Sequence, residues 1–423
     1  MTQGVRDATA ALHGDGSASL ITARPLVTAG VRPSVVLDPV LERAGVRVCS
    51  RCIYDERVAG IEFDGDGVCT YCRQTEALEA EYQTGTPVGE ARLAQIVDTI
   101  KTAGRGKRYD CVIGVSGGTD SSYMVHLARE WGLRPLAVHY DNTWNSAIAT
   151  QNIQKVLGGL DVDLYTHVID NREADDIFRA FFRAGVAEIE ASTDLAIAET
   201  MYRAAWKHRI GFVLEGHSFL TEGITPVGRN YFDGKYIQSI HRQFGGRPMK
   251  TYPLMTFNRL LFWSAVARIR KVRPFWYVNY TKEDARSFLE GRFGWKYYGG
   301  HHLENRMTAY LHGIYLPQKF NTDMRNNTLA ARARLGTISR ETAWAEYNTP
   351  PTVEEELLEY FKKRLRLTDE EYDSVMGSPP RSWHEFPTYK KRFERLRPLF
   401  GALARANLVP MSFYLKYCFP ARD

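Results

Sequence analysis

The sequence has no apolar run long enough to cross a bilayer, and residues 1–20 lack the continuous apolar segment of a secretory signal. Its net charge is small, because 55 Lys and Arg face 49 Asp and Glu, and this excess suits small acidic or polyphosphate substrates without requiring nucleic acid. Cysteine is scarce, with six residues in 423. These absences predict a cytoplasmic protein of two or three domains whose cysteines serve metal or redox chemistry rather than disulfides.

Two common nucleotide-binding motifs are missing from the most informative stretch, Cys111–Gly132, which reads CVIGVSGGTDSSYMVHLAREWG. It has neither the lysine of a GxxxxGK(S/T) loop nor a GxGxxG fingerprint. It does have a short apolar run, a turn rich in glycine and hydroxyls, and an amphipathic run. Glycines let backbone N–H groups approach an anion at the positive end of the following helix. We therefore expect phosphate binding at Gly114, Ser116, Gly117, Gly118, Thr119, Asp120, Ser121 and Ser122.

Short apolar runs alternate with helical patterns from Tyr109 onward. This alternation predicts an α/β fold with a doubly wound, mostly parallel sheet, which binds ligands where its strands end. After about residue 229 the sequence becomes aromatic and then helical. Capping-box spacing predicts helix starts at Thr281 and Thr352, and RIRKVRP, residues 268–274, is expected to end a helix with a solvated basic face. The expected strands are CVIGV, LAVHY, DLYTHV and GFVLEG, and the expected helices lie near Tyr123–Trp131, Ile148–Leu157, Ala174–Ala184 and Leu195–Lys207.

Four cysteines form two CxxC pairs, Cys49 with Cys52 and Cys69 with Cys72. Two such pairs are typical of a tetrahedral thiolate Zn²⁺ site, and four thiolates leave no open position, so the metal would be structural. A zinc-ribbon-like insert of this size has too little core to fold without it. An iron–sulfur cluster is the alternative. Cys111 is expected in the core, and Cys418 is expected to be either packed or incidental.

The stretch SGGTDS resembles the SGGxDS loop of the N-type ATP pyrophosphatases, the PP-loop superfamily, which includes GMP synthetase, asparagine synthetase and the tRNA-thiolating enzymes. The resemblance implies that the loop, with Ser116 and Asp120 as catalytic residues, grips the β- and γ-phosphates of ATP. A substrate oxygen then attacks the α-phosphate and is adenylylated. A carboxylate beside phosphate makes sense if Asp120 caps the helix or shares a Mg²⁺ ion with the phosphates.

Two further strand ends belong to the same resemblance. HYDNTWNS corresponds to the region near adenine and ribose, although a plain turn with a helix cap fits it equally well. EGHSFLTEG corresponds to the region near the phosphates and Mg²⁺, with Glu222 as the candidate carboxylate and an ordinary loop glutamate as the alternative. The residues concerned are His139, Asp141 and Asn142 in the first segment, and Gly216, His217 and Glu222 in the second.

Nine stretches resemble, as an ordered set, the N-acetyl sugar amidotransferase family of bacterial surface-polysaccharide biosynthesis. They cover roughly residues 45–380 and read VRVCSRCIYD, IEFDGDGVCTYC, GVSGGTDSSYMVHLA, RPLAVHYDNTWNS, DLYTHVI, EGHSFLTEG, YIQSIHRQFG, WKYYGGHHLEN and LPQKFNTDMR. The resemblance implies that an acetamido group on a nucleotide-linked sugar becomes an acetamidino group, with ammonia from glutaminase-like and cyclase-like partners; a homodimer is left open. The chain departs from the family in a longer N-terminal arm and in TPVGRNYFDGKY, so the sugar is not specified.

The substrate side is expected in the aromatic segment and after it. Lys319 is the catalytic candidate for the positive charge that the loop lacks, with a surface lysine as the alternative. Candidate substrate contacts are Trp295, Tyr297, Tyr298, His301, His302 and Arg325. We expect a mobile arm over residues 1–42, a four-cysteine zinc module over 43–80, an ATP pyrophosphatase domain over 81–229 and an aromatic-rich, helical substrate region over 230–423.

Two other functions compete with amidine formation. Sulfur transfer, or amidation of another carbonyl in a tRNA base or specialised metabolite, would use the same adenylylation; a persulfide mechanism would have only Cys111 and Cys418 outside the CxxC pairs. A non-catalytic zinc-ribbon module that binds nucleic acid is disfavoured, because basic and acidic residues balance in the insert. These residues are Arg47, Arg51, Arg57 and Arg73 against Asp55, Glu56, Asp64 and Asp66.

Overall fold

The computed structural model describes residues 45–224, 231–299, 303–406, 408–409 and 411–420. Its centre is a sheet of five parallel strands in the order β3-β2-β1-β4-β5. The chain moves outward from β1 to β3 and then returns to the other side of β1, so the sheet is doubly wound, as predicted. Ligands of such sheets bind where the winding reverses, at the carboxyl ends of β1 and β4. The strands are β1 (Cys111–Gly114), β2 (Pro135–Asp141), β3 (Leu164–Val168), β4 (Phe212–Leu214) and β5 (Arg270–Val272).

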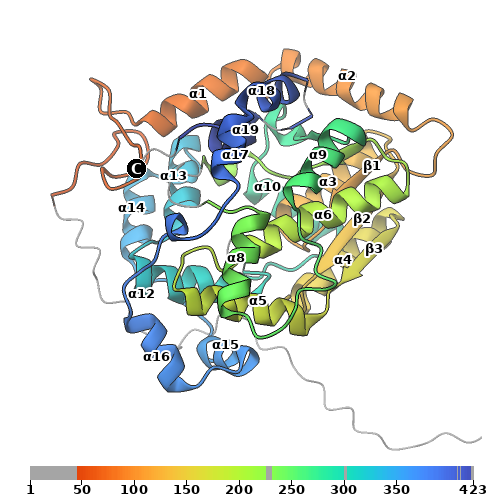
Figure 1. Ribbon diagram of the computed structural model, residues 1–423. Helices are drawn as coiled ribbons and strands as arrows, with labels where there is room; N and C mark the ends of the chain where they lie inside the picture. The colour runs from red at the N-terminus through yellow and green to blue at the C-terminus, as the bar shows by residue number, and fades with distance from the viewer. Residues whose placement is uncertain (1–44, 225–230, 300–302, 407, 410, 421–423) are drawn as a thin grey trace, which may run out of the picture.

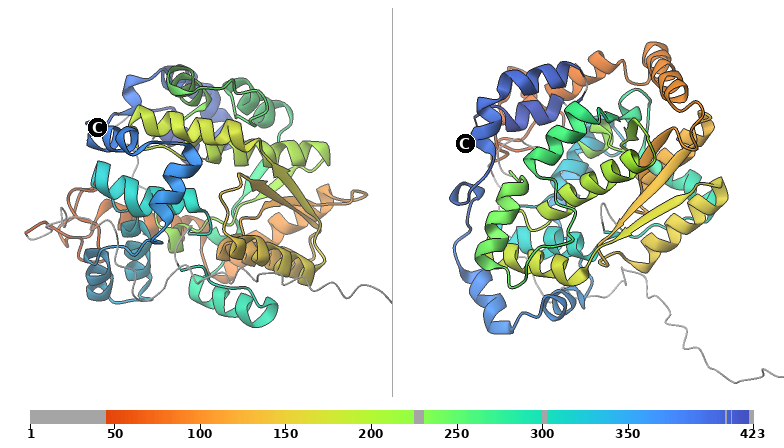
Figure 2. Two further views of the ribbon diagram at one scale, coloured as in Figure 1. Left: turned by 90° about the horizontal axis from the view of Figure 1, so that it is seen from below. Right: turned by 45° about the vertical axis from the view of Figure 1, so that its right-hand side comes forward.

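Helices cover both faces of the sheet (Figures 1 and 2), because alternate strand residues face opposite sides. Ile113 of β1 packs with helices α2, α3, α4 and α10, whereas its neighbour Val112 packs with α6 and the segment after α9. Thr86 and Ser146 cap the N-termini of α2 and α4. These helices are α2 (Pro87–Ala103), α3 (Thr119–Glu130), α4 (Ala147–Leu160), α6 (Ala191–Lys207) and α10 (Lys282–Phe293).

The largest hydrophobic core joins α5 to the C-terminal helices rather than to the sheet. Its centre is aromatic: the rings of Tyr310 and Phe361 stack with centroids 3.5 Å apart, and Phe182 stacks on Tyr372. The helices of this part and of its surroundings are α5 (Asn171–Ala184), α7 (Phe219–Glu222), α8 (Gly234–Phe244), α9 (Phe257–Leu261), α11 (Arg306–Tyr310), α12 (Leu316–Phe320), α13 (Arg325–Leu335), α14 (Arg340–Asn348), α15 (Leu357–Leu365), α16 (Asp369–Gly377), α17 (Lys390–Arg395), α18 (Arg397–Arg405) and α19 (Met411–Tyr417).

Four shorter helical segments complete the described structure. Two are π-helical, η1 (Phe262–Val266) after α9 and η3 (Leu311–Tyr315) between α11 and α12. Two are 3₁₀ turns, η2 (Pro274–Trp276) and η4 (Trp383–Glu385). Among the described residues, none of the helices has the length and apolar character that a membrane crossing needs.

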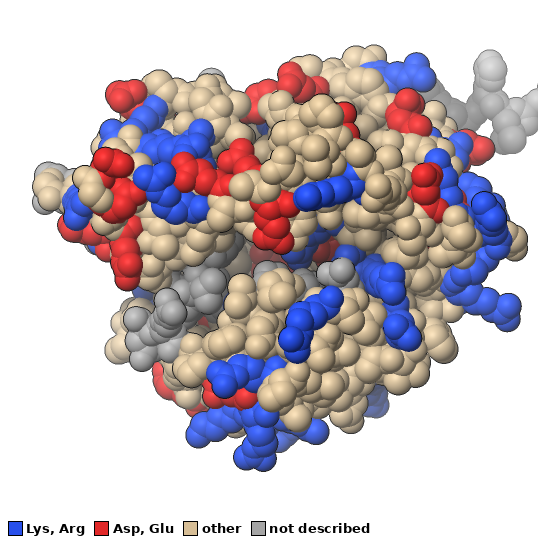
Figure 3. Space-filling model, turned by 90° about the horizontal axis from the view of Figure 1, so that it is seen from above, with Lys and Arg blue, Asp and Glu red and all other residues tan. Residues whose placement is uncertain are grey.

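The cysteine module at the start of the described chain continues into α1 (Thr70–Tyr82). It packs against α13 and α14, which lie beside it in Figure 1, through a core that includes Tyr54, Leu329 and Ala343. Acidic and basic side chains are interspersed over the face of the molecule seen in Figure 3. That mixture agrees with the small net charge.

Two local expectations are wrong. RIRKVRP does not end a helix: it contains β5, because Lys271 and Arg273 pair with the partly buried Glu215, which follows β4. Thr352 does not cap a helix either, since α15 begins at Leu357 after Glu356. Thr281, by contrast, caps α10 as its spacing predicted, and its hydroxyl accepts from the backbone N–H of Asp284. β5 and α10 also extend the sheet and its cover beyond residue 229.

Candidate active site

The glycine-rich turn connects the end of β1 to the start of α3. Gly117 has a φ of +83°, and a Cβ there would lie 2.2 Å from the carbonyl oxygen of Ala149, so the position requires glycine. The carbonyl of Gly117 accepts from the buried indole N–H of Trp295 at 3.0 Å. The turn is therefore fixed from two sides, by α4 and by the aromatic segment.

The loop hydroxyls are held together at the mouth of the turn. Ser116 Oγ lies 3.4 Å from Ser121 Oγ and accepts from the backbone N–H of Gly118 at 3.2 Å. It also donates to Glu304 Oε1 at 3.2 Å. A residue far along the chain thus contacts the loop, and the first turn of α3 presents its N–H groups beside these hydroxyls.

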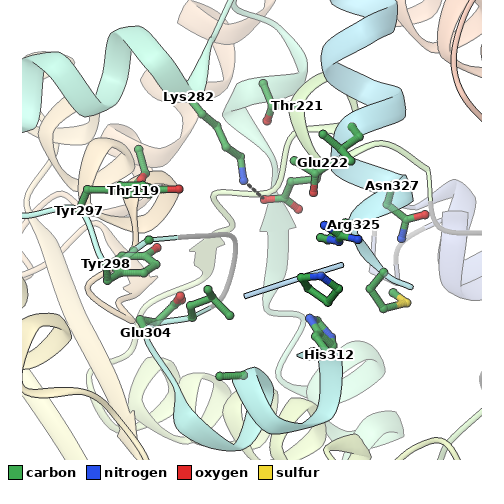
Figure 4. A pocket seen from close by; sticks show the side chains of 18 of the residues that line it. Thr119, Thr221, Glu222, Lys282, Tyr297, Tyr298, Glu304, His312, Arg325 and Asn327 are labelled. Atoms are coloured by element: carbon green, nitrogen blue, oxygen red, sulfur yellow. Dashed lines mark ion pairs between the residues drawn. The ribbon is translucent and has the colours of Figure 1, made fainter. Parts of the chain in front are cut away.

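A cleft of about 1040 Å³ opens from this loop toward the C-terminal helices. Its walls come from the sheet side and from the helical region, and Figure 4 shows their side chains facing one space. Of the predicted loop residues, Ser116, Gly118, Thr119, Asp120 and Ser121 line it, whereas Gly114, Gly117 and Ser122 lie behind. The remaining predicted residues that line it are Gly216, His217, Glu222, Tyr297, Tyr298 and Arg325.

Asp120 and Glu222 share one cation, Lys282 at the start of α10. The Lys282 ammonium lies 2.8 Å from Asp120 Oδ2 and 3.6 Å from Glu222 Oε1, and Figure 4 shows it extending toward Glu222. Tyr280 donates a further hydrogen bond to Asp120. Burial opposes ionisation of Asp120, but Lys282 and Tyr280 hold its pKa below the usual range. Asp120 does not cap α3, since Gly118 is the N-cap residue.

Lys282, rather than Lys319, provides the positive charge beside the loop. Lys319 does not line the cleft, because its ammonium donates to the carbonyl oxygens of Val375 and Ser378, both at 2.6 Å, at the end of α16. The expected role of Lys319 therefore has no support in the structure. The Thr281 cap locates Lys282 at the first position of α10, but no sequence pattern shows that α10 begins beside the loop.

The polar residues at the end of β2 and just after it stabilise local turns rather than line the cleft. Asp141 accepts from the backbone N–H of Thr143 at 2.7 Å, and Asn142 accepts from that of Trp144 at 3.1 Å. His139 Nδ1 lies 2.8 Å from the carbonyl oxygen of Val115. The plain-turn alternative accounts for these contacts. After β4, His217 Nε2 lies 3.5 Å from Glu222 Oε2.

The aromatic segment divides between support and exposure. Trp295 is buried behind the loop, whereas Tyr297 is 40% exposed in the cleft with the Arg286 guanidinium 3.7 Å from its ring centroid. The hydroxyl oxygen of Tyr298 lies 3.0 Å from the position of a Cβ on Gly118. His301 and His302 lie outside the described residues.

Several residues that line the cleft could not be predicted from sequence motifs. Glu304 reaches Ser116, and His312 reaches the cleft from η3 (Figure 4), where a π-helical turn shifts the register of the helix. Arg325 is held by Asp323 at 2.7 Å and by the Thr349 carbonyl oxygen at 2.8 Å. The one available signal was the run WKYYGGHHLEN, which contains Glu304 but does not indicate its direction.

The four cysteines of the two CxxC pairs come together as predicted. Their Sγ atoms all lie within 4.8 Å of one another and are buried, with Cys49 and Cys72 at 3.8 Å and Cys52 and Cys69 at 3.7 Å. Thiolates bound at about 2.3 Å to one tetrahedral ion are about 3.8 Å apart. The group therefore fits a single metal ion, and the Arg334 side chain donates to Cys72 at 3.3 Å from α13.

The remaining two cysteines are buried, in the sheet and near the C-terminus. Burial raises the pKa of the Cys111 thiol, which is fully inaccessible. Burial likewise raises the pKa of the Cys418 thiol, to about 11. Neither lines the cleft, so neither has the low pKa and access that a reactive thiol needs.

Comparisons with known proteins add the following relatives. An uncharacterized protein of Methanocaldococcus jannaschii is 23% identical over 322 residues, which cover 75% of this chain and 98% of that protein. Among solved structures, NMN synthetase from Francisella tularensis aligns with a TM-score of 0.25 and 15% identity over 51% of this chain and 89% of its own. The tRNA thiolase NcsA from Methanococcus maripaludis, with its 4Fe–4S cluster, aligns with a TM-score of 0.31 and 12% identity over 73% and 90%.

A third structure, the NH₃-dependent NAD synthetase from Campylobacter jejuni, aligns with a TM-score of 0.28 and 13% identity over 69% of this chain and 97% of its own. Residues 304–397 match the family described as LPS biosynthesis protein WbpG-like, C-terminal domain. This domain begins at Glu304, which contacts the glycine-rich turn through Ser116, and it contributes His312 and Arg325 to the cleft. The match over residues 304–397 supports the family predicted from the sequence, and the predicted parallel sheet is present, with the glycine-rich turn directly after its strand β1.

Proposed function

We propose that the chain is an ATP-dependent amidotransferase that converts the N-acetyl amide of a nucleotide-linked sugar into an amidine and releases AMP and pyrophosphate. One observation carries the proposal: the lysine-free loop opens into a single cleft whose opposite wall belongs to the WbpG-like domain. At about 1040 Å³ the cleft has room for a nucleotide together with a second substrate.

The chemistry follows from the weakness of an amide as an electrophile. The amide oxygen attacks the α-phosphorus of ATP, the bond to the β-phosphate breaks, and pyrophosphate leaves. Ammonia then adds to the activated carbon, and AMP departs with the former amide oxygen. Each half-reaction balances without an oxidant or reductant.

The chain's own residues have distinct parts in this proposal. The N–H groups at the start of α3 and the hydroxyls of Ser116 and Ser121 bind the β- and γ-phosphates. Lys282 neutralises charge on the departing pyrophosphate, which is the role that the loop itself lacks. Asp120 and Glu222 are the residues that would hold Mg²⁺, since both converge on one cation, the Lys282 ammonium; bound there, Mg²⁺ would neutralise phosphate charge.

The nitrogen is proposed to reach the cleft from separate glutaminase-like and cyclase-like partners. The attacking ammonia has to be unprotonated, and a sheltered route from a partner would keep it so. Free ammonium in excess substitutes for such a partner in a test with the isolated chain.

For the four cysteines we propose one structural Zn²⁺ ion. The spacing of the thiolates supports a single ion, because the four irons of a cubane cluster would need its thiolates farther apart. Elemental analysis should find about one zinc per chain and a colourless protein. A brown protein with iron and sulfide would contradict this assignment and would favour the sulfur-transfer alternative.

The function is tested by its products. The chain, ATP, Mg²⁺, ammonium and a UDP-linked N-acetyl sugar should yield AMP and pyrophosphate in step with an amidine product. The variant Ser116→Ala should fold and lose most turnover, whereas the matched variant Ser287→Ala, on the exposed face of α10, should keep it. Formation of ADP and phosphate would refute the proposed cleavage.

A further inference from the structure

A second cavity, of about 280 Å³, lies away from the cleft between the first turn of α5, the loop after α8 and the C-terminal end of α15. Helices α5 and α15 pack against each other there. Five arginines and two aspartates are among the nine residues that line it, and the arginines come from all three segments: Arg172, Arg179, Arg247, Arg364 and Arg366. We call this cavity the arginine pocket.

The two aspartates of the arginine pocket are already engaged by donors of the protein. Asp176 accepts from the backbone N–H groups of Gly246 and Arg247 at 2.9 and 3.0 Å, and its Oδ2 lies 3.0 Å from His241 Nε2. Asp175 accepts from the indole N–H of Trp144 at 2.9 Å. Their negative charge is therefore largely satisfied, and the pocket keeps a positive field.

The five arginines differ in what they contact. Arg179 pairs with Asp176, and Arg364 pairs with Asp175 and lies with its guanidinium carbon 4.1 Å from the centroid of the Trp144 ring. Within the part of the chain that the structure describes, no hydrogen bond or ion pair involves the guanidinium groups of Arg172, Arg247 and Arg366. All three residues are exposed, so solvent screens part of their mutual repulsion, and a bound anion would offset the remainder.

The backbone at Arg366 adds to this interpretation. Arg366 ends α15 with a φ of +55°, a left-handed conformation that favours glycine. An arginine there costs about 1 kcal/mol of conformational free energy. The guanidinium that it brings to the pocket is a physical reason for keeping a side chain at that position.

We propose that the arginine pocket binds a small phosphate-class anion from solution, inorganic phosphate or pyrophosphate in size. Guanidinium groups bind phosphate oxygens in pairs, and the N-terminal turn of α5 adds its dipole, although Asp170 already caps the helix. An open cavity of about 280 Å³ bordered by three segments suits such an anion rather than a nucleotide sugar. Arg364 also donates to the carbonyl oxygens of Asn142 and Thr143, so the pocket adjoins the turn after β2.

The proposal is tested by calorimetric titration of the full chain with inorganic pyrophosphate. A triple variant, Arg172→Gln, Arg247→Gln and Arg366→Gln, is compared with a control of equal charge change at exposed positions, Arg105→Gln, Arg292→Gln and Arg395→Gln. We expect the pocket variant to lose one binding site present in the wild type, with affinity there reduced about tenfold or more. The control should retain it, and chloride at equal ionic strength should not displace the anion.

The result is independent of the proposed function, because pyrophosphate bound in the cleft is retained by both triple variants. Unchanged melting curves show that the variants fold. An equal number of sites and equal affinity in the wild type and the pocket variant would overturn the proposal. Equal losses in the pocket variant and the control would also overturn it, since they would indicate general charge screening.

Discussion

The two walls of the cleft hold their charges in different ways. The sheet wall, which consists of the turn after β1, the segment after β4 and the start of α10, presents backbone N–H groups, small hydroxyls and one lysine shared by Asp120 and Glu222. The helical wall, which belongs to the WbpG-like domain, presents long side chains that are held by partners, such as Arg306 by Glu354 at 2.8 Å and Arg325 by Asp323. The first arrangement suits a polyphosphate of any origin. The second fixes a shape, which is what selection of one substrate requires.

The helical wall packs on the cysteine module through α13, whereas the sheet side contacts the module at Ile224, two residues after Glu222. Tyr54 of that module donates to the side-chain oxygen of Asn327 at 2.7 Å, and Asn327 lines the cleft from α13. Metal removal should therefore damage the helical wall more than the sheet wall. The predictions below use this difference.

We expect the largest effect from Cys69→Ser. Loss of one thiolate should release the metal and lower the free energy of unfolding by several kcal/mol, because the module and α13 share a core. Metal content and thermal unfolding measure it. Cys418→Ser, also buried, should cost only about 1 kcal/mol and leave the metal in place. Full metal content in Cys69→Ser would contradict the assigned site.

Lys282→Ala should remove the positive charge of the sheet wall and leave the helical wall little changed. Turnover is expected to fall about 10²- to 10³-fold, the usual effect of removing one charge-stabilising group in an active site. Initial rates of AMP release measure it, with Lys363→Ala on the exposed face of α15 as the matched control. Wild-type turnover in Lys282→Ala would show that the charge beside the loop has no part in the reaction.

Acid should weaken the sheet half through Glu215. Burial alone would raise the pKa of this carboxyl, but Lys271 and Arg273 lower it to about 2. A carboxylate with a depressed pKa stabilises the fold above its unfolded pKa and ceases to do so as the pH falls through its folded pKa. As the pH falls from the ordinary pKa near 4.5 to about 2, the ion pairs of Glu215 should lose about 3 kcal/mol of their contribution to the free energy of unfolding.

Urea unfolding at a series of pH values measures this contribution. The quantity of interest is the difference between wild type and Glu215→Gln, since other carboxylates titrate in both. The difference should be large near neutral pH and shrink as the pH approaches 2. A difference that stays constant with pH would mean that Glu215 is not ionised in the fold.

The smallest expected effect concerns Tyr297, in the segment that precedes the WbpG-like domain and lines the cleft. Tyr297→Ala removes an exposed ring on which Arg286 lies, and a stacking contact of about 1 kcal/mol corresponds to roughly a fivefold rise in the KM of the sugar substrate. The KM of ATP should not change. Tyr297→Phe keeps the ring and should behave like the wild type. A rise in the KM of ATP instead would place Tyr297 on the nucleotide side.

The sequence predicts the sheet half better than the helical half, for a physical reason. Parallel strands are short apolar runs, and the turn after β1 has to contain glycine at 117, so both leave local patterns. The CxxC pairs likewise specify their own geometry. The sequence did not predict the edge strand β5, because its lysine and the following arginine look like a solvated basic face, although both pair with Glu215.

The helical wall arises from contacts between distant residues, which no local pattern encodes. Lys319 looks like a cleft lysine in the sequence, yet it caps the end of α16, while Lys282 reaches the loop because of where α10 begins. Glu304 meets Ser116 across 188 positions of the chain. Such pairings are determined by the packing of the whole fold.

The transfer of the amide oxygen to AMP tests the central claim most directly. The N-acetyl carbonyl of the sugar substrate is labelled with oxygen-18, and AMP is examined by mass spectrometry after turnover with ATP and ammonium. Adenylylation of the carbonyl predicts one labelled oxygen in each AMP and none in pyrophosphate. Unlabelled AMP, with the label in inorganic phosphate or water, would contradict the account.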